Sequence, residues 1–236
     1  MGGLAVSSYA LMLYLGLTVG MCAQAYAAGV AGLSTVRVWV ATLMLLPCAL
    51  GGARLLFVTS HWPIYRRAPS RIWRRSEGGM SLYGGMSLML VCSLPVLEWV
   101  GVSFWRFWDV STFCILVAMA FTRVGCLMHG CCAGRESSGR LTVTLSNHEG
   151  VKLRRIPVQL LEAAWAVLLL AGVVVLWRRL SPGDAFLIAA GGYGLGRFAL
   201  QPCRAAREWI AGVDLQQAIS CVTVASSLTL LIVRHI

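Results

Sequence analysis

Long runs of apolar residues, interrupted by short polar stretches, dominate the hydrophobic pattern of this chain. A helix needs about 20 apolar residues to cross the hydrocarbon core of a bilayer, and lipid offers no hydrogen-bond partner to an open backbone. Each run is therefore predicted to form a membrane-spanning α-helix. The predicted spans are residues 8–31, 36–58, 80–102, 110–132, 157–177, 183–202 and 212–233. The pattern predicts an all-α, polytopic membrane bundle of about seven transmembrane helices.

The first of these runs also has some features of a secretory signal peptide. Ala25-Tyr26-Ala27 resembles a cleavage site, but a signal peptide starts with basic residues and no Lys or Arg precedes this run. We therefore expect a retained helix.

Two stretches between the predicted spans are longer than the others, residues 59–79 and 133–156. The first contains five Arg and two Trp, and Trp near the end of a span is typical of a membrane interface. In the second, Leu141–Leu145 alternates as a short strand does, which predicts a small extramembrane hairpin. We expect a single transmembrane domain over residues 1–236, with this insert at about 133–156.

Composition narrows the class of protein further. Of the 236 residues, 58% are hydrophobic and 12% are charged, whereas a soluble domain carries about 25% charged residues. These values exclude an ordinary soluble protein, and the high hydrophobicity excludes a disordered chain. The formal net charge of +11 favours anionic membrane lipids as partners. Nucleic acid is not expected as a partner, because no basic face is free of the apolar spans.

Several ionisable residues interrupt the apolar spans, where a charged side chain is costly and therefore suggests function. Arg123 lies in the fourth predicted span, although it could instead extend to the nearby interface. Gln159 and Glu162 lie three residues apart near the start of the fifth. Glu162 could be a base, but an ion pair with Arg123 or Arg197 is the favoured interpretation.

A polar stripe follows one face of the sixth predicted helix. Its residues are spaced by 4, 4 and 3 positions, a spacing that places them on one face. They are Tyr193, Arg197, Gln201 and Arg204. Because Arg suits bidentate contact with phosphate, the stripe is predicted to face protein, water or an anionic ligand. The alternative for Arg204 is that it marks the membrane interface.

Paired glycines surround Tyr83 in the segment Glu77–Gly85. Glycine pairs let a backbone approach a ligand closely, or let two helices pack closely with Tyr83 at the interface.

Cysteines gather at the end of the fourth predicted span, where Cys126, Cys131 and Cys132 lie close to His129 in the sequence. These residue types are soft metal ligands. The spacing is not that of a zinc finger, and no second Cys/His pair accompanies the cluster. We therefore predict no metal site, and expect a disulfide, packing or a tight turn.

Five segments resemble, in order, the signature blocks of the bacterial prolipoprotein diacylglyceryl transferase family. One of them, EGGMSLYGG, is similar to the family's EGGMSFHGG stretch, and another, PVQLLE, resembles HPSQLYE. The five segments are Tyr9–Met12, Glu77–Gly85, Thr122–Arg135, Pro157–Glu162 and Tyr193–Arg204. Five blocks in the right order are much more specific than any single block.

The resemblance implies a seven-helix membrane enzyme, and we expect no cofactor. Such an enzyme transfers diacylglycerol from phosphatidylglycerol to the thiol of a lipobox cysteine in a preprolipoprotein, releases glycerol phosphate and leaves a thioether. It implies a multi-pass protein of the bacterial cytoplasmic (inner) membrane, with the N-terminus and the active site toward the outer face. This orientation places 12 basic residues of the inter-span stretches outside and 5 inside, against the positive-inside rule. We favour the motif order, because basic residues around an anionic-lipid site have a local reason to be there.

The resemblance also implies roles for individual residues. Negative charge builds on the leaving phosphate, so cationic groups are needed there. Arg123 and Arg197 match the arginines expected to hold it, and Tyr83 and Glu162 complete the expected catalytic set. The expected substrate-binding residues are Tyr9, Gly84, Gly134, Arg135, Gln159, Tyr193, Gln201 and Arg204.

Several polar groups of the family are replaced in this chain. Tyr83 stands where the family has a histidine, and Cys126 and Cys131 stand where it has an asparagine and an acid. Gln201 replaces a second acid. The base is therefore left open between Tyr83 and His129. The alternative function is a catalytically silent or divergent lipid-binding paralogue that acts on another substrate; a transporter is weaker because no repeat symmetry is visible.

Overall fold

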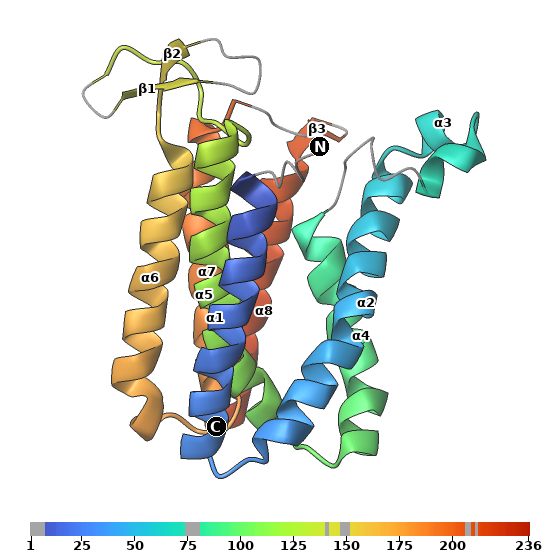
Figure 1. Ribbon diagram of the computed structural model, residues 1–236, viewed down its shortest axis with the longest axis vertical. Helices are drawn as coiled ribbons and strands as arrows, with labels where there is room; N and C mark the ends of the chain where they lie inside the picture. The colour runs from blue at the N-terminus through green and yellow to red at the C-terminus, as the bar shows by residue number, and fades with distance from the viewer. Residues whose placement is uncertain (1–7, 74–80, 140–141, 147–151, 206–208, 211) are drawn as a thin grey trace, which may run out of the picture. The chain divides into compact units, whose positions relative to one another are not determined.

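The computed structural model describes residues 8–73, 81–139, 142–146, 152–205, 209–210 and 212–236. Helices make up most of this part of the chain, and two short hairpins accompany them (Figure 1). In chain order the elements are α1 (Ser8–Val30), α2 (Thr35–Ser60), α3 (Trp62–Tyr65), η1 (Pro69–Trp73), α4 (Leu82–Val100), α5 (Phe104–His129), β1 (Val143–Ser146), β2 (Lys152–Arg155), α6 (Val158–Leu176), η3 (Trp177–Arg179), α7 (Asp184–Leu200), η4 (Gln201–Cys203), β3 (Trp209–Ile210), β4 (Val213–Asp214) and α8 (Leu215–His235).

Six of the helices described are long and apolar enough to cross a membrane, namely α1, α2, α4, α5, α6 with η3, and α8. The remaining predicted span, residues 183–202, is α7, which has 17 residues and continues directly into the 3-10 turn η4. The protein is thus a helical membrane bundle, and its helices agree with the prediction of about seven spans.

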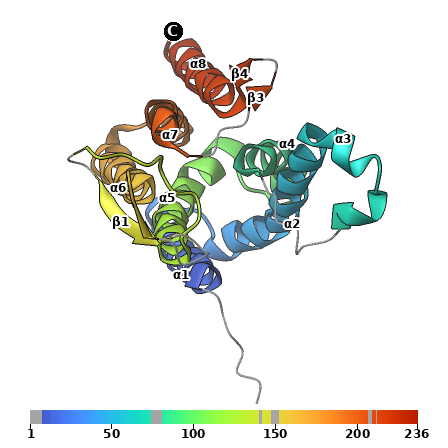
Figure 2. The same ribbon diagram turned by 90° about the horizontal axis from the view of Figure 1, so that it is seen from above.

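The chain divides into two compact units, residues 28–107 and the combination of residues 1–27 with 108–236. In the smaller unit, α2 and α4 lie side by side (Figure 2). Two glycines permit this contact. A Cβ atom on Gly52 would lie 2.3 Å from the Gly84 carbonyl oxygen, and one on Gly84 would lie 2.4 Å from that of Gly52. The expectation of a single domain stays a prediction.

In the larger unit, close contacts fix α1 and α7 against α5. A Cβ atom on Gly16 of α1 would lie 2.7 Å from Cβ of Phe121 on α5, so glycine is needed there. Near the start of α5, the buried carboxylate of Asp109 accepts backbone hydrogen bonds from Gly183 (2.5 Å) and Phe186 (3.0 Å). These bonds satisfy N–H groups at the start of α7, which have no partner within the helix.

A hairpin occupies the stretch between α5 and α6. Strands β1 and β2 are antiparallel, with Val143 opposite Arg155 and Ser146 opposite Lys152. The predicted hairpin is therefore confirmed, although the strand lies at Val143–Ser146 and Leu141 is outside the described residues.

Candidate active site

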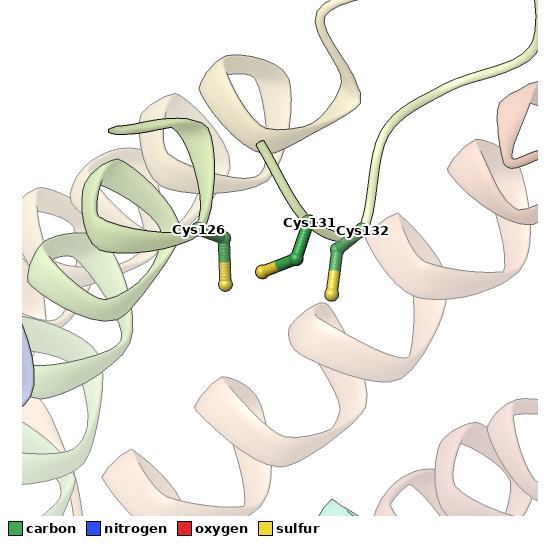
Figure 3. Close-up of side chains that lie close together, drawn as sticks. All are labelled: Cys126, Cys131 and Cys132. Carbon is green, nitrogen blue, oxygen red and sulfur yellow. The ribbon is translucent and has the colours of Figure 1, made fainter. Parts of the chain in front are cut away.

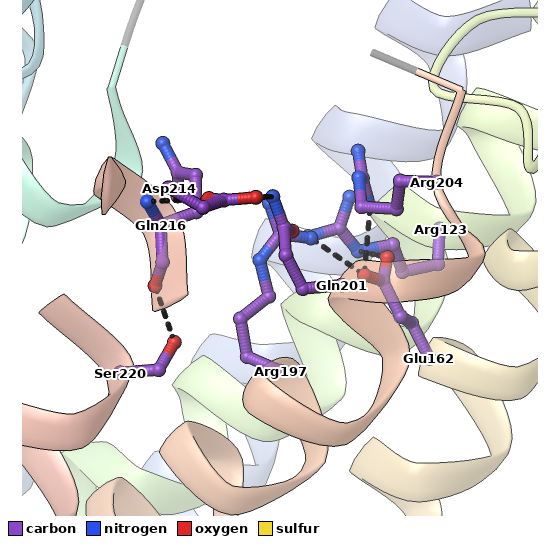
Figure 4. Close-up of polar contacts among 8 residues, drawn as sticks. All are labelled: Arg123, Glu162, Arg197, Gln201, Arg204, Asp214, Gln216 and Ser220. Carbon is purple, nitrogen blue, oxygen red and sulfur yellow. Dashed lines mark hydrogen bonds and ion pairs between the residues drawn. The ribbon is translucent and has the colours of Figure 1, made fainter. Parts of the chain in front are cut away.

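One buried carboxylate on α6 collects three arginines from other parts of the larger unit (Figure 4). Arg123 on α5 places its Nε 2.9 Å from Glu162 Oε2. Arg197 on α7 and Arg204, which follows η4, place their Nη1 atoms 2.6 and 2.7 Å from Glu162 Oε1. The Glu162 side chain is 4% exposed and those of the three arginines 11–14%. The predicted ion pair of Glu162 with Arg123 or Arg197 is confirmed, since both are formed.

Positive charge exceeds negative charge in this arginine cluster. Three guanidinium groups share one carboxylate, and the second carboxylate drawn in Figure 4, Asp214, is hydrogen-bonded to Gln201 instead. Holding several like charges at low exposure costs several kcal/mol per unpaired ion, so a further anion would be stabilised here. Guanidinium groups match phosphate oxygens in geometry and charge. The cluster is therefore suited to hold a phosphate group.

The polar stripe of α7 divides between two partners. Arg197 and Arg204 reach Glu162, and Tyr193 is a hydrogen-bond neighbour of Arg123. The Gln201 amide nitrogen lies 3.0 Å from both carboxylate oxygens of Asp214, which also accepts hydrogen bonds from the backbone N–H groups of Gln216 and Gln217 in the first turn of α8. Gln201 therefore ties the end of α7 to the start of α8.

The segment that follows α5 pairs through backbone hydrogen bonds with the segment that carries Arg204. The backbone N–H of Arg135 donates to the Cys203 carbonyl (2.8 Å), and that of Ala205 donates to the Ala133 carbonyl (3.2 Å). A Cβ atom on Gly134 would lie 3.0 Å from the Cys203 carbonyl oxygen and 2.3 Å from that of Ile156, so only glycine fits where these segments meet. This pairing fixes the backbone from which Arg204 reaches Glu162.

The three cysteines at the end of α5 come together through the way the helix ends (Figure 3). Gly130 has φ = 73°, its N–H bonds the Leu127 carbonyl, and the Cys131 N–H bonds the Cys126 carbonyl. This pair of bonds around a left-handed glycine is the Schellman motif, in which the second residue beyond the helix folds back onto its last turn. With Cys132 next in the chain, the three Sγ atoms all lie within 4.8 Å of one another.

Hydrogen bonds hold this turn in place, and hydrogen bonds, burial and nearby charges shift the pKa values of its thiols. Gln159, which is 1% exposed, donates from Nε2 to the Cys131 carbonyl (2.8 Å) and so holds the turn against α6. Cys132 has φ = 57°, an uncommon value for a residue other than glycine. The hydrogen bond with Cys126, together with Arg204 and Arg123, lowers the pKa of the Cys132 thiol to about 5. Burial and the neighbouring Cys132 raise the pKa of Cys131.

Sequence comparison shows which family this chain belongs to. A family model described as prolipoprotein diacylglyceryl transferase matches residues 1–233. The chain belongs to this family. Its relatives include proteins named phosphatidylglycerol–prolipoprotein diacylglyceryl transferase from Streptococcus pyogenes serotypes M5 (strain Manfredo), M49 (strain NZ131) and M1. Each is 26% identical over 251 residues, which cover 99% of this chain and 93% of the relative.

Most of the residues expected from the resemblance to the diacylglyceryl transferase family lie in the larger unit, close to the arginine cluster or to the cysteine turn. They are Tyr9, Arg123, Gly134, Arg135, Gln159, Glu162, Tyr193, Arg197, Gln201 and Arg204. Tyr9 on α1 is an electrostatic neighbour of the three cysteines and Arg123, and its ring centroid lies 6.4 Å from that of His129. Arg135 takes part through its backbone, while its side chain is exposed.

Two expected residues, Tyr83 and Gly84, lie in the smaller unit, near the start of α4. Gly84 is buried in the contact with α2, as the helix-packing alternative for the glycine pairs predicted. Glu77–Met80, the first part of that motif, lies outside the described residues. The catalytic or binding roles of Tyr83 and Gly84 stay predictions.

Two features of the site were missed by the sequence analysis. Asp214 is the partner of Gln201, and its position immediately before the long apolar α8 is a typical N-cap signal that could have identified it. The tight turn expected at the cysteines is confirmed and all three are free thiols, but the convergence of their sulfur atoms was missed. The glycine immediately before Cys131 is the signal, because a glycine just past a helix end predicts a backward turn.

Proposed function

We propose that this protein transfers a diacylglyceryl group from phosphatidylglycerol to a cysteine thiol of a preprolipoprotein lipobox and so forms a thioether. Family membership supports the reaction class, and the curated relatives are named for this lipid and this acceptor. The observation that carries the proposal in this chain is the convergence of Arg123, Arg197 and Arg204 on Glu162 with an excess of positive charge.

The arginine cluster provides what the proposed leaving group requires. Breaking the bond between the glycerol carbon and the phosphate oxygen places additional negative charge on the phosphate. Groups fixed in advance around that charge stabilise the transition state more than mobile ones do. In this mechanism Arg123 and Arg197 bind the phosphate and Arg204 supports them. Glu162 orients all three by ion pairing, and so acts as a positioning residue rather than as the base.

Product analysis with a defined peptide tests the proposal. A synthetic lipobox peptide is incubated with the purified protein in phosphatidylglycerol micelles, and peptide mass and released glycerol phosphate are measured. We expect a peptide heavier by one diacylglyceryl group and an equal amount of glycerol phosphate. A peptide with Ser in place of the acceptor Cys should stay unmodified. An unmodified Cys peptide, with lipid still bound, would contradict the transferase and favour the lipid-binding paralogue.

Arginine substitutions connect the activity to the cluster. Arg123→Ala and Arg197→Ala should each lower the transfer rate by about 100-fold or more, since removing one donor to a developing oxyanion costs about that much. Arg123→Lys should also be impaired, because an ammonium group lacks the planar fork. Arg178→Ala is the matched control, since Arg178 is exposed on η3. Equal rates in all four variants would contradict the phosphate-binding role.

We further propose that the protein resides in the bacterial cytoplasmic membrane with the active site toward the outer face. Basic residues around an anionic-lipid site have a local reason to lie there despite the positive-inside rule. With seven spans and the N-terminus outside, a C-terminal alkaline phosphatase fusion should be inactive and a C-terminal fluorescent protein fusion should fluoresce. An active phosphatase fusion would contradict this orientation.

A further inference from the structure

The reaction proposed above needs a thiolate, and the arginine cluster supplies no group that would form one. A thiol attacks carbon as its thiolate, and an ordinary cysteine has a pKa near 8.5. Glu162 is engaged by three arginines, which favours its ionised form but leaves its oxygens occupied. Among the described residues of the larger unit, the cysteine turn is a cluster of nucleophilic groups that this mechanism does not use.

No metal site was predicted from the spacing of the cysteines, but the fold brings three of them together, and the cysteine turn has the ligand set of a catalytic zinc site. Structural zinc sites are closed by four protein ligands, whereas catalytic sites have three and take a water or substrate as the fourth. Among the described residues, Cys126, Cys131 and Cys132 form a group that could hold a metal ion. Around a tetrahedral ion with Zn–S distances near 2.3 Å, sulfur atoms lie about 3.8 Å apart. The observed spread, within 4.8 Å, needs only a small contraction.

Two structural features hold these ligands in place. Cys126 lies on the last turn of α5, and the Schellman bonds fix Cys131 above it. The buried amide of Gln159 holds the carbonyl of Cys131 from α6. Partners that orient a metal ligand from outside the coordination sphere are typical of built metal sites. Thiolates also select zinc over magnesium or calcium.

Charge near the turn supports thiolate ligands. Three thiolates and one Zn²⁺ carry a net charge of −1, and Arg123 and Arg204 are electrostatic neighbours of Cys132. These arginines also belong to the cluster that binds Glu162, so the cysteine turn adjoins the proposed phosphate site. A metal bound at the turn would therefore lie next to the atoms that react.

We propose that Cys126, Cys131 and Cys132 bind a zinc ion that takes the acceptor thiol of the substrate peptide as its fourth ligand and activates it. This inference rests on the proposed function. A thiol that coordinates zinc loses its proton outright. The sulfur then attacks the glycerol carbon that carries the phosphate ester, and a C–S bond forms. The C–O bond breaks with its electron pair on the phosphate oxygen, and the thiol proton leaves with glycerol phosphate or solvent. No oxidation or reduction is involved.

Metal analysis of the full chain tests the binding part. Protein purified in detergent without chelators should contain about one zinc per chain, as expected for a single site with three protein ligands. Cys126→Ser, Cys131→Ser and Cys132→Ser should each lower zinc content at least tenfold, while Cys221→Ser, at an exposed cysteine on α8, should keep it. Gln159→Leu should bind zinc about 10–100-fold more weakly. Copper in place of zinc, no metal at all, or a mass 2 Da low from a disulfide between two of the three would overturn the proposal.

Cobalt substitution tests the fourth ligand separately from catalysis. Co²⁺ at the site should show thiolate charge-transfer absorption, and adding the Cys-containing lipobox peptide should intensify it, whereas the Ser-containing peptide should not. An unchanged spectrum with the Cys peptide overturns the activation step. The transfer assay distinguishes the two proposals: transfer that persists at full rate in Cys132→Ser overturns the zinc site but not the transferase. Zinc binding and a cobalt response without transfer overturn the transferase but not the site.

Discussion

Replacing Glu162 with Gln tests whether one carboxylate holds the arginine cluster together. Gln keeps the shape of the side chain and its hydrogen-bonding oxygen but removes the charge. At a separation of about 4 Å between charge centres, each guanidinium–carboxylate attraction is about 4 kcal/mol at an effective dielectric of 20. Desolvation of the buried groups and repulsion between the arginines offset most of the three attractions.

Removing one partner of a buried ion pair typically costs 3–5 kcal/mol, because the remaining charges stay buried without compensation. We therefore expect E162Q to lower the free energy of unfolding by about 3–5 kcal/mol, or the Tm by roughly 10 °C. The measurement is thermal unfolding of the purified protein in neutral detergent. The matched control is E136Q. Glu136 is 62% exposed and pairs with Arg155 at 3.3 Å, so its loss should cost less than about 1 kcal/mol.

Anionic lipid gives the same experiment a second readout. With Glu162 neutral, the three guanidinium groups lose the carboxylate that pairs with all of them, so a ligand carrying phosphate should stabilise E162Q more than it stabilises the wild type. Phosphatidylglycerol should therefore restore part of the lost Tm, and a zwitterionic phospholipid should restore less. Unfolding of E162Q and the wild type at the same temperature would refute this role of Glu162. An equal shift of both proteins by phosphatidylglycerol would refute it as well.

Three further predictions follow from particular contacts. Gly134→Ala should lower both the Tm and the transfer rate, because its Cβ would lie 2.3 Å from the Ile156 carbonyl oxygen and displace the backbone of Arg204. Gly172→Ala, where a Cβ meets nothing within 4 Å, should be neutral or slightly stabilising, and equal effects of the two would contradict this. Gln201→Glu should destabilise the protein by about 1–3 kcal/mol at neutral pH, because it places a second carboxylate against that of Asp214. The difference in Tm between this variant and the wild type should shrink as acid protonates the two carboxylates, and a difference that is unchanged at low pH would count against this repulsion. In chelator-treated protein, iodoacetamide should alkylate Cys132 at a rate that is constant from pH 6.5 to 8 and falls only as the pH approaches about 5, because the thiolate is already formed above that pKa. A rate that rises steadily toward pH 8.5 would instead show an ordinary thiol.

The sequence alone determined the membrane helices of this protein. Apolar runs of about 20 residues report directly on the solvent around a helix, so the seven predicted spans correspond to α1, α2, α4, α5, α6, α7 and α8. The polar stripe of α7 was equally predictable, because helical periodicity is a local property. The spacing of Tyr193, Arg197, Gln201 and Arg204 could not show which partner each of them has.

Only the tertiary structure decided how these residues combine. Whether Arg197 meets Glu162 or Gln201 meets Asp214 depends on the rotation and approach of α6, α7 and α8, and no local pattern encodes that rotation. The meeting of the three thiols depends partly on a local signal, the glycine that ends α5, and partly on Gln159 reaching from α6. The sequence thus determined which helix, and which face of that helix, carries each group, because apolar runs and helical periodicity are local properties. The packing of the helices determined which charges and thiols face one another, because contacts between distant residues form only when the helices assemble.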